Sequence, residues 1–113
     1  MDDTARRPRL VIVAILTPRL GSMEIFREYE TKAARIVARH GGAIERTVVE
    51  EAAQPGSPIR EVHMVCFPDS AAFANYRADP DLASLAALRD AAIAHTELLF
   101  GRDGPDYMSL CRA

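Results

Sequence analysis

The feature that most constrains this chain is an apolar run near its beginning, from Leu10 to Leu16. The run lies between Pro8 and Pro18, is rich in β-branched residues and is too short for a typical helix, so it predicts a strand. Both faces of this strand are apolar. An antiparallel sheet packed against helices covers one face only, and the second apolar face therefore needs its own cover. A partner subunit is the simplest cover, and we expect a homodimer.

A helix is predicted next, with Ser22 as its N-cap and His40 as its last residue. Gly41 and Gly42 follow, where a left-handed stop is expected. The buried face of this helix is identified by residues that recur with helical spacing. These residues are Phe26, Tyr29, Ala33, Ile36, Val37 and His40.

The other elements follow from periodicity and turn residues. They are strands over 43–50 and 60–67, a short helix from 70, a longer helix from Pro80 to about His95, and a strand over 97–100. The order β-α-β-β-α-β predicts an α+β, ferredoxin-like split unit with an antiparallel sheet and helices on one face.

The chain length of 113 residues fits one domain. We expect a flexible lead-in over residues 1–9, the domain over 10–100, and a tail over 101–113. Residues 107–112 of the tail are a candidate extra edge strand.

Composition excludes several classes of function. With 14 basic and 16 acidic residues the net charge is −2, which disfavours binding to nucleic acid or to an anionic membrane. No apolar stretch approaches the roughly 20 residues that span a bilayer. Cys66 and Cys111 form no C-x-x-C motif, and reduced thiols in a cytoplasmic protein fit them best. The three histidines form no i, i+4 pair, so no local metal motif is present.

Arg89 is the most informative single residue, because it lies within the apolar stripe of the second long helix. A buried guanidinium needs a partner. That partner is either a carboxylate of Asp69, of Glu61 or of a second chain, or the anionic group of a ligand at the mouth of a pocket.

His63 lies on the predicted third strand, on the face opposite Val62, Met64 and Cys66. It is either a hydrogen-bonded structural residue or a general base for a weakly acidic C–H or phenol. His40 and His95 are interpreted as residues at helix ends that bond free carbonyl groups.

Tyr29 and Tyr76 each lie on the buried face of a helix, as core residues or as the lining of a pocket. Cys66 is expected to be a small buried hydrophobe.

Five short motifs carry a resemblance to a known family. They are Phe26-x-x-Tyr29, His40-Gly41-Gly42, Phe67-Pro68-Asp69 with Ala71-Ala72, Tyr76-x-x-Asp79-Pro80, and Leu88-Arg89. Over roughly Val11 to Phe100 the chain resembles the dimeric α/β-barrel superfamily, and within it the small bacterial proteins of domain of unknown function thirteen-thirty.

The resemblance implies two sheets paired across a two-fold axis and a pocket between helices and sheet. Its relatives include cofactor-free monooxygenases, haem-degrading enzymes, lactone isomerases and stress-responsive proteins, so fold does not choose among them. The chain has no tryptophan, which disfavours the Asn, Trp and His set of the haem-degrading relatives. Asp81-Leu82 also departs from the acidic–aromatic pair of the family.

Three hypotheses result. The first is a protein that binds a small carboxylated or phenolic molecule through Tyr29, Tyr76 and Arg89 and needs no cofactor. The second is a cofactor-independent monooxygenase or isomerase in which His63 is the base and Arg89 orients the anion. The third is a purely structural dimerisation module.

Overall fold

The computed structural model describes residues 8–52 and 54–107. Its elements follow the predicted order, with the second helical region divided in three. They are β1 (Leu10–Pro18), α1 (Met23–Arg39), β2 (Ala43–Val49), β3 (Glu61–Phe67), α2 (Ser70–Arg77), α3 (Pro80–Ala83), α4 (Ala86–Ala92) and β4 (Ile93–Gly101).

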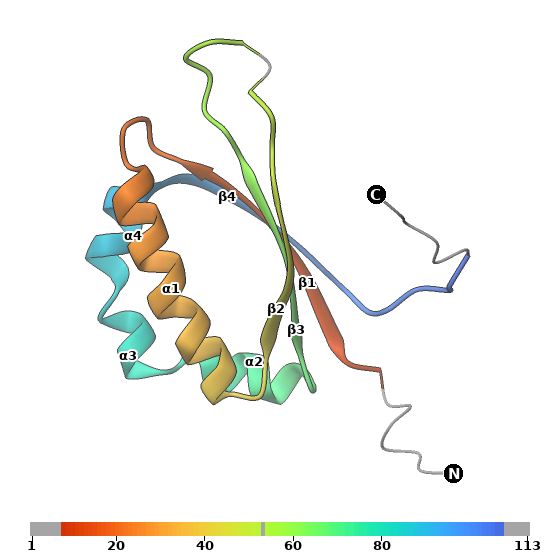
Figure 1. The fold of residues 1–113 in the computed structure, drawn as a ribbon. Helices are drawn as coiled ribbons and strands as arrows, with labels where there is room; N and C mark the ends of the chain where they lie inside the picture. Colours follow the sequence, from red (N-terminus) through yellow and green to blue (C-terminus); the bar gives the residue numbers. More distant parts are fainter. Residues whose placement is uncertain (1–7, 53, 108–113) are drawn as a thin grey trace.

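The four strands form one sheet in the order β2-β3-β1-β4, with every neighbouring pair antiparallel. Figure 1 shows the helices on the same side of this sheet, with α1 lying across it and α4 near the start of β4. The chain therefore has the predicted ferredoxin-like α+β fold. None of the described helices has the length and apolar character needed to cross a membrane.

The predicted helix from Pro80 to about His95 is interrupted after Ala83 and is wrong at its end. Helical structure ends at Ala92, and β4 begins at Ile93. The cause is tertiary: the Ala92 carbonyl accepts the backbone N–H of Arg19 at 2.9 Å, and Ile93 pairs with Pro18 of β1. Pairing with β1 overrides the helix propensity of this alanine-rich segment. His95 consequently lies exposed on β4, away from any helix end.

Ser22 begins α1 as predicted, but its side chain makes no cap hydrogen bond. Its hydroxyl lies 2.6 Å from the Arg19 carbonyl oxygen and 3.0 Å from that of Ala92, so it fastens the β1–α1 turn to the end of α4. At the other end of α1, Gly41 has the expected positive φ of 78°. Gly42 is required for a steric reason, because a Cβ atom at this position would lie only 2.7 Å from the Cys66 carbonyl oxygen.

The predicted buried face of α1 is confirmed from Phe26 to Val37, and His40 beyond it is half-buried. Phe26 packs with Leu16 and Ala14, whereas Val37 packs with Ile12 and Phe67. Two hydrophobic clusters therefore lie between the helices and the sheet rather than one continuous core.

The other side of the sheet, which we call the open face, is apolar in the middle. Val13 of β1 pairs with Met64 of β3 and with Leu99 of β4, so the three side chains stand beside one another. Met64 is 41% exposed and Leu99 62% exposed. No described helix covers this face (Figure 1). Of the predicted edge strand over 107–112, residues 108–112 lie outside the described residues, and β4 ends at Gly101.

Candidate active site

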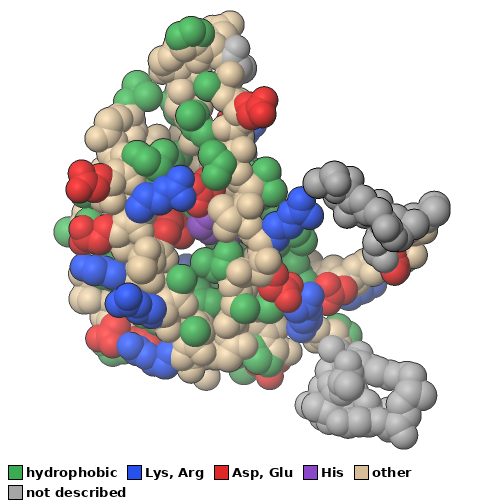
Figure 2. Space-filling model, viewed as in Figure 1, with side chains coloured by type: hydrophobic (Ala, Val, Ile, Leu, Met, Phe, Trp, Pro, Cys, Tyr) green, Lys and Arg blue, Asp and Glu red, His purple; other side chains and the backbone are tan. Residues whose placement is uncertain are grey.

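A cavity of about 490 Å³ separates the helices from the sheet. Figure 2 shows the hollow between the two layers, with acidic, basic and histidine side chains gathered around it. Most of its wall is apolar and comes from β1, β3 and α1, while α2, α3, α4 and β4 supply the rim. A close-packed domain leaves few voids larger than a water molecule, so a hollow of this size is a candidate binding site.

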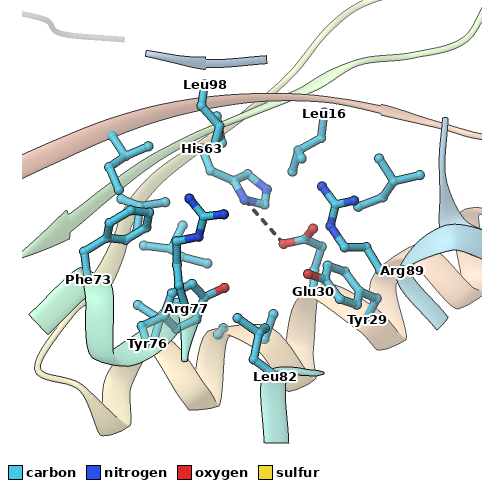
Figure 3. Close-up of a pocket in the computed structure, with 18 of the residues that line it drawn as sticks. Leu16, Tyr29, Glu30, His63, Phe73, Tyr76, Arg77, Leu82, Arg89 and Leu98 are labelled. Carbon is cyan, nitrogen blue, oxygen red and sulfur yellow. Dashed lines mark ion pairs between the residues drawn. The ribbon is translucent and has the colours of Figure 1, made fainter. Parts of the chain in front are cut away.

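His63 lies on the cavity wall and is 4% exposed. Its Nε2 atom lies 2.7 Å from Glu61 Oε1, and its Nδ1 atom lies 3.5 Å from Glu30 Oε2. Figure 3 shows the imidazole and the Glu30 carboxylate facing one another across the cavity. When His63 is neutral, Nε2–H donates to Glu61, and Nδ1 is then left as a hydrogen-bond acceptor.

The two carboxylates differ in their surroundings. Glu61 has a side chain 5% exposed and lies 3.5 Å from the Arg27 guanidinium. Burial raises the pKa of Glu30, the nearby Glu61 raises it further, and His63, Arg89 and Arg27 oppose the change. The Glu30 carboxylate therefore faces Nδ1 from a partly buried position, whereas Glu61 holds the other ring nitrogen.

Arg89 lines the cavity from α4, where it is half-buried. Its guanidinium donates to Thr96 Oγ1 at 2.8 Å. Burial raises the pKa of the Tyr29 phenol, and the charge of Arg89 partly opposes the increase. The predicted alternative of a salt bridge to Asp69 or Glu61 is not found, since neither forms an ion pair with Arg89 among the described residues.

An aromatic wall closes the other end of the cavity. Phe67 and Tyr76 have ring centroids 5.4 Å apart, and Phe73 lies 5.5 Å from Phe67 and 5.5 Å from Phe100. Burial raises the pKa of Tyr76 to about 12, so its phenol stays a hydrogen-bond donor at neutral pH. This wall offers flat apolar surfaces of the kind that pack against a ring.

The structure brings together all four residues that the sequence singled out, since Tyr29, His63, Tyr76 and Arg89 line the same cavity. Sequence reasoning missed Glu30. It lies four residues after Phe26 and three before Ala33, within the apolar stripe of α1. The argument applied to Arg89, that a charge in an apolar stripe needs a reason, would have found it.

Sequence reasoning also missed Arg77 as a lining residue. It follows Phe73 by one helical turn and Tyr76 by one residue. The position four residues after Phe73, on the same side of the helix, was the available signal.

The remaining candidates lie elsewhere. His40 Nε2 lies 2.8 Å from Asp79 Oδ2, so the imidazole contacts a carboxylate rather than the free carbonyl groups expected. This contact and the neighbouring Arg39 lower the pKa of Asp79 and join α1 to α3. Cys66 is buried, as predicted. Among the described residues no group of three His, Cys, Asp or Glu side chains is arranged to hold a metal ion.

Solved structures share this fold at low identity. A protein of unknown function from Rhodopseudomonas palustris is 15% identical, with a TM-score of 0.68 over 91% of this chain and 90% of that one. SnoaB, a cofactor-independent oxygenase from Streptomyces nogalater, is 19% identical, with a TM-score of 0.61 over 86% and 96%. An uncharacterized NIPSNAP domain protein from Burkholderia xenovorans is 16% identical, with a TM-score of 0.66 over 92% and 99%.

These likenesses establish the fold and leave the chemistry open. A search of curated proteins found no match. A family model described as Domain of unknown function (DUF1330) matches residues 11–101, which include every strand and helix from Val11 onward. The chain is a member of the DUF1330 family.

Proposed function

We propose that each subunit binds one small carboxylated or phenolic molecule in the cavity, and that the protein works as a homodimer. The single observation that carries the proposal is a buried histidine, flanked by two carboxylates, on the wall of an otherwise largely apolar hollow. A few polar groups that converge in an apolar pocket are typical of small-molecule sites. The proposal needs no cofactor.

Each polar group has a part in this binding. Nδ1 of His63 accepts a hydrogen bond from a ligand hydroxyl, while Glu61 fixes the tautomer. Arg89 stabilises negative charge that develops on a ligand oxygen at the same end of the cavity. Tyr29 and Tyr76 pack against the ligand.

The homodimer rests on the open face. An exposed apolar patch at the centre of a sheet indicates an interaction surface, and Met64, Leu99 and Val48 are between 41% and 62% exposed on a single chain. A second copy of the chain supplies an equally apolar face across a two-fold axis. Pairing of the two sheets would bury these side chains.

The binding proposal is tested by native mass spectrometry on gently purified protein, before and after incubation with 2-naphthol. We expect a dimer that carries one small molecule per chain. Ala34→Phe, which fills the cavity from half-buried Ala34 on α1, should abolish this mass increment. Ala38→Phe, one turn further on the exposed side, is the matched control and should keep it. A bare dimer in both conditions would contradict ligand binding and favour a structural module.

A second candidate is a cofactor-independent monooxygenase or isomerase. The Glu61–His63 contact favours it, because a carboxylate that holds one imidazole nitrogen stabilises the imidazolium formed when the other accepts a substrate proton. The fold of the cofactor-independent oxygenase SnoaB supports the same class. Any turnover found in a substrate screen should be lost in His63→Ala and kept in His95→Ala, and turnover that survives His63→Ala would rule this mechanism out.

A further inference from the structure

Arg77, in the last turn of α2, is a second arginine on the cavity wall. Figure 3 shows its side chain directed toward the cavity on the Phe73 and Tyr76 side, whereas Arg89 and Tyr29 lie on the other side of Glu30. The guanidinium carbon lies 5.8 Å from the centre of the Phe73 ring. The ring therefore positions the cation beside the aromatic wall.

Arg77 has no carboxylate within ion-pair distance among the residues that the structure describes, unlike Arg9, Arg39 and Arg60. Arg89, the other arginine of the cavity, donates to Thr96 and has Glu30 nearby. Arg77 is exposed, and its charge is therefore available to a ligand at the edge of the cavity.

The charged side chains around the cavity indicate which end of a ligand each part of the cavity would accept. Glu30 and Glu61 flank His63 on both sides, so a carboxylate at His63 would meet two like charges. A neutral ligand hydroxyl would instead find a hydrogen-bond acceptor in His63 Nδ1. The end near Arg77 carries positive charge and borders Phe73, Tyr76 and Phe67.

We propose that the ligand is a flat aromatic hydroxy acid that places its hydroxyl at His63, its ring against the Phe73–Tyr76 wall and its carboxylate on Arg77 at the rim of the cavity. This inference rests on the proposed binding function and names its ligand class. It moves the anion site from Arg89 to Arg77.

Three probes of one ring system test the inference by isothermal titration calorimetry. They are 6-hydroxy-2-naphthoate with groups at opposite ends, 2-naphthoate without the hydroxyl, and 2-naphthol without the carboxylate. We expect 6-hydroxy-2-naphthoate to bind most tightly. Arg77→Gln should weaken both acids about tenfold, as expected for loss of a charge-assisted contact at a partly exposed site, and leave 2-naphthol unchanged.

Arg35→Gln is the matched control, since Arg35 is an exposed arginine of α1 that does not line the cavity. It should leave all three affinities unchanged, and Arg77→Lys should recover part of the loss. If Arg77→Gln weakens 2-naphthol as much as the acids, or weakens none of them, the assignment of Arg77 is overturned while binding stands. If the wild-type protein binds none of the three probes, the binding function itself fails and the assignment falls with it.

Discussion

The two faces of the sheet differ in what they expose and in what they bury. The helix-covered face carries Glu61 and His63 in nearly complete burial, beside a cavity of about 490 Å³. The open face carries Val13, Met64 and Leu99, three apolar side chains aligned across three strands, with Arg46 of β2 next to Met64. The covered face thus combines an apolar core with a few buried polar groups, whereas the open face leaves apolar side chains exposed. We propose that the two faces serve two tasks, ligand binding under the helices and association on the outer side.

The largest effect is expected from a charge placed on the open face. In Met64→Asp a carboxylate enters the proposed dimer interface, with only the exposed cross-strand neighbour Arg46 beside it, so that its burial costs about 3 kcal/mol and weakens association about a hundredfold. Sedimentation equilibrium should give the mass of a monomer. The circular dichroism spectrum should be unchanged, which would show that the variant is folded. Leu20→Asp makes the same replacement at a loop residue that is 72% exposed, and should leave the dimer intact. Equal masses for both variants would remove the open face as the interface.

The next effect concerns packing under the helices. Phe67 is 1% exposed and contacts Phe73 and Tyr76. Phe67→Ala should lower the free energy of unfolding by about 3 kcal/mol, the lower end for a buried aromatic, because the adjacent cavity lets its neighbours relax. Urea denaturation measures the change. A loss below about 1 kcal/mol would mean that the aromatic wall is not part of the folded core.

Arg89 is expected to have a smaller effect. Arg89→Met removes the hydrogen bond to Thr96 and the cation near Glu30, and should lower the free energy of unfolding at neutral pH by about 1–2 kcal/mol. In a Glu30→Gln background the same replacement should cost less, because no buried carboxylate is then left without its cation. Denaturation of the two single variants and the double variant tests this coupling, and strictly additive losses would contradict it.

The smallest expected effect is a change in how the free energy of unfolding depends on pH. The pKa of Glu30 is raised in the folded state, so that state holds the proton to higher pH than the unfolded chain does. Stability from this group is full below the unfolded pKa and is lost as pH rises through the folded pKa. Glu30→Gln should therefore gain stability relative to the wild type as pH increases above the usual glutamate range. A constant difference across the series would show that Glu30 is not perturbed.

The two faces also differ in how far the sequence predicted them. The apolar run Leu10 to Leu16 indicated a strand with two apolar faces, and the helical spacing of α1 identified its buried residues from Phe26 to Val37. Both patterns are local, and local patterns are what periodicity reports. The start of β4 at Ile93 was missed, because it depends on pairing with Pro18, which is distant in the sequence.

The site was partly within reach of the same reasoning. Arg89 was found because it is a charged residue in an apolar helical pattern, and Glu30 fits that criterion equally well. His63 was found because histidine is the residue type most suited to act as a base near neutral pH. The contact from His63 to Glu30 was beyond this reasoning, since it requires the distance between α1 and β3. The contact from His63 to Glu61 joins two residues on the same face of one strand and was within reach. A pocket between helices and sheet was expected from the family resemblance alone, and its volume was beyond residue patterns because it depends on how far the helices stand from the sheet.

If ligand binding and association use opposite faces of the sheet, single substitutions should separate the two properties. Native mass spectrometry of Met64→Asp and Ala34→Phe with 6-hydroxy-2-naphthoate shows whether they do. We expect Met64→Asp to be a monomer that still carries one ligand, and Ala34→Phe to be a dimer that carries none. Loss of both properties in either variant would contradict the account, because it would show that one surface serves both tasks.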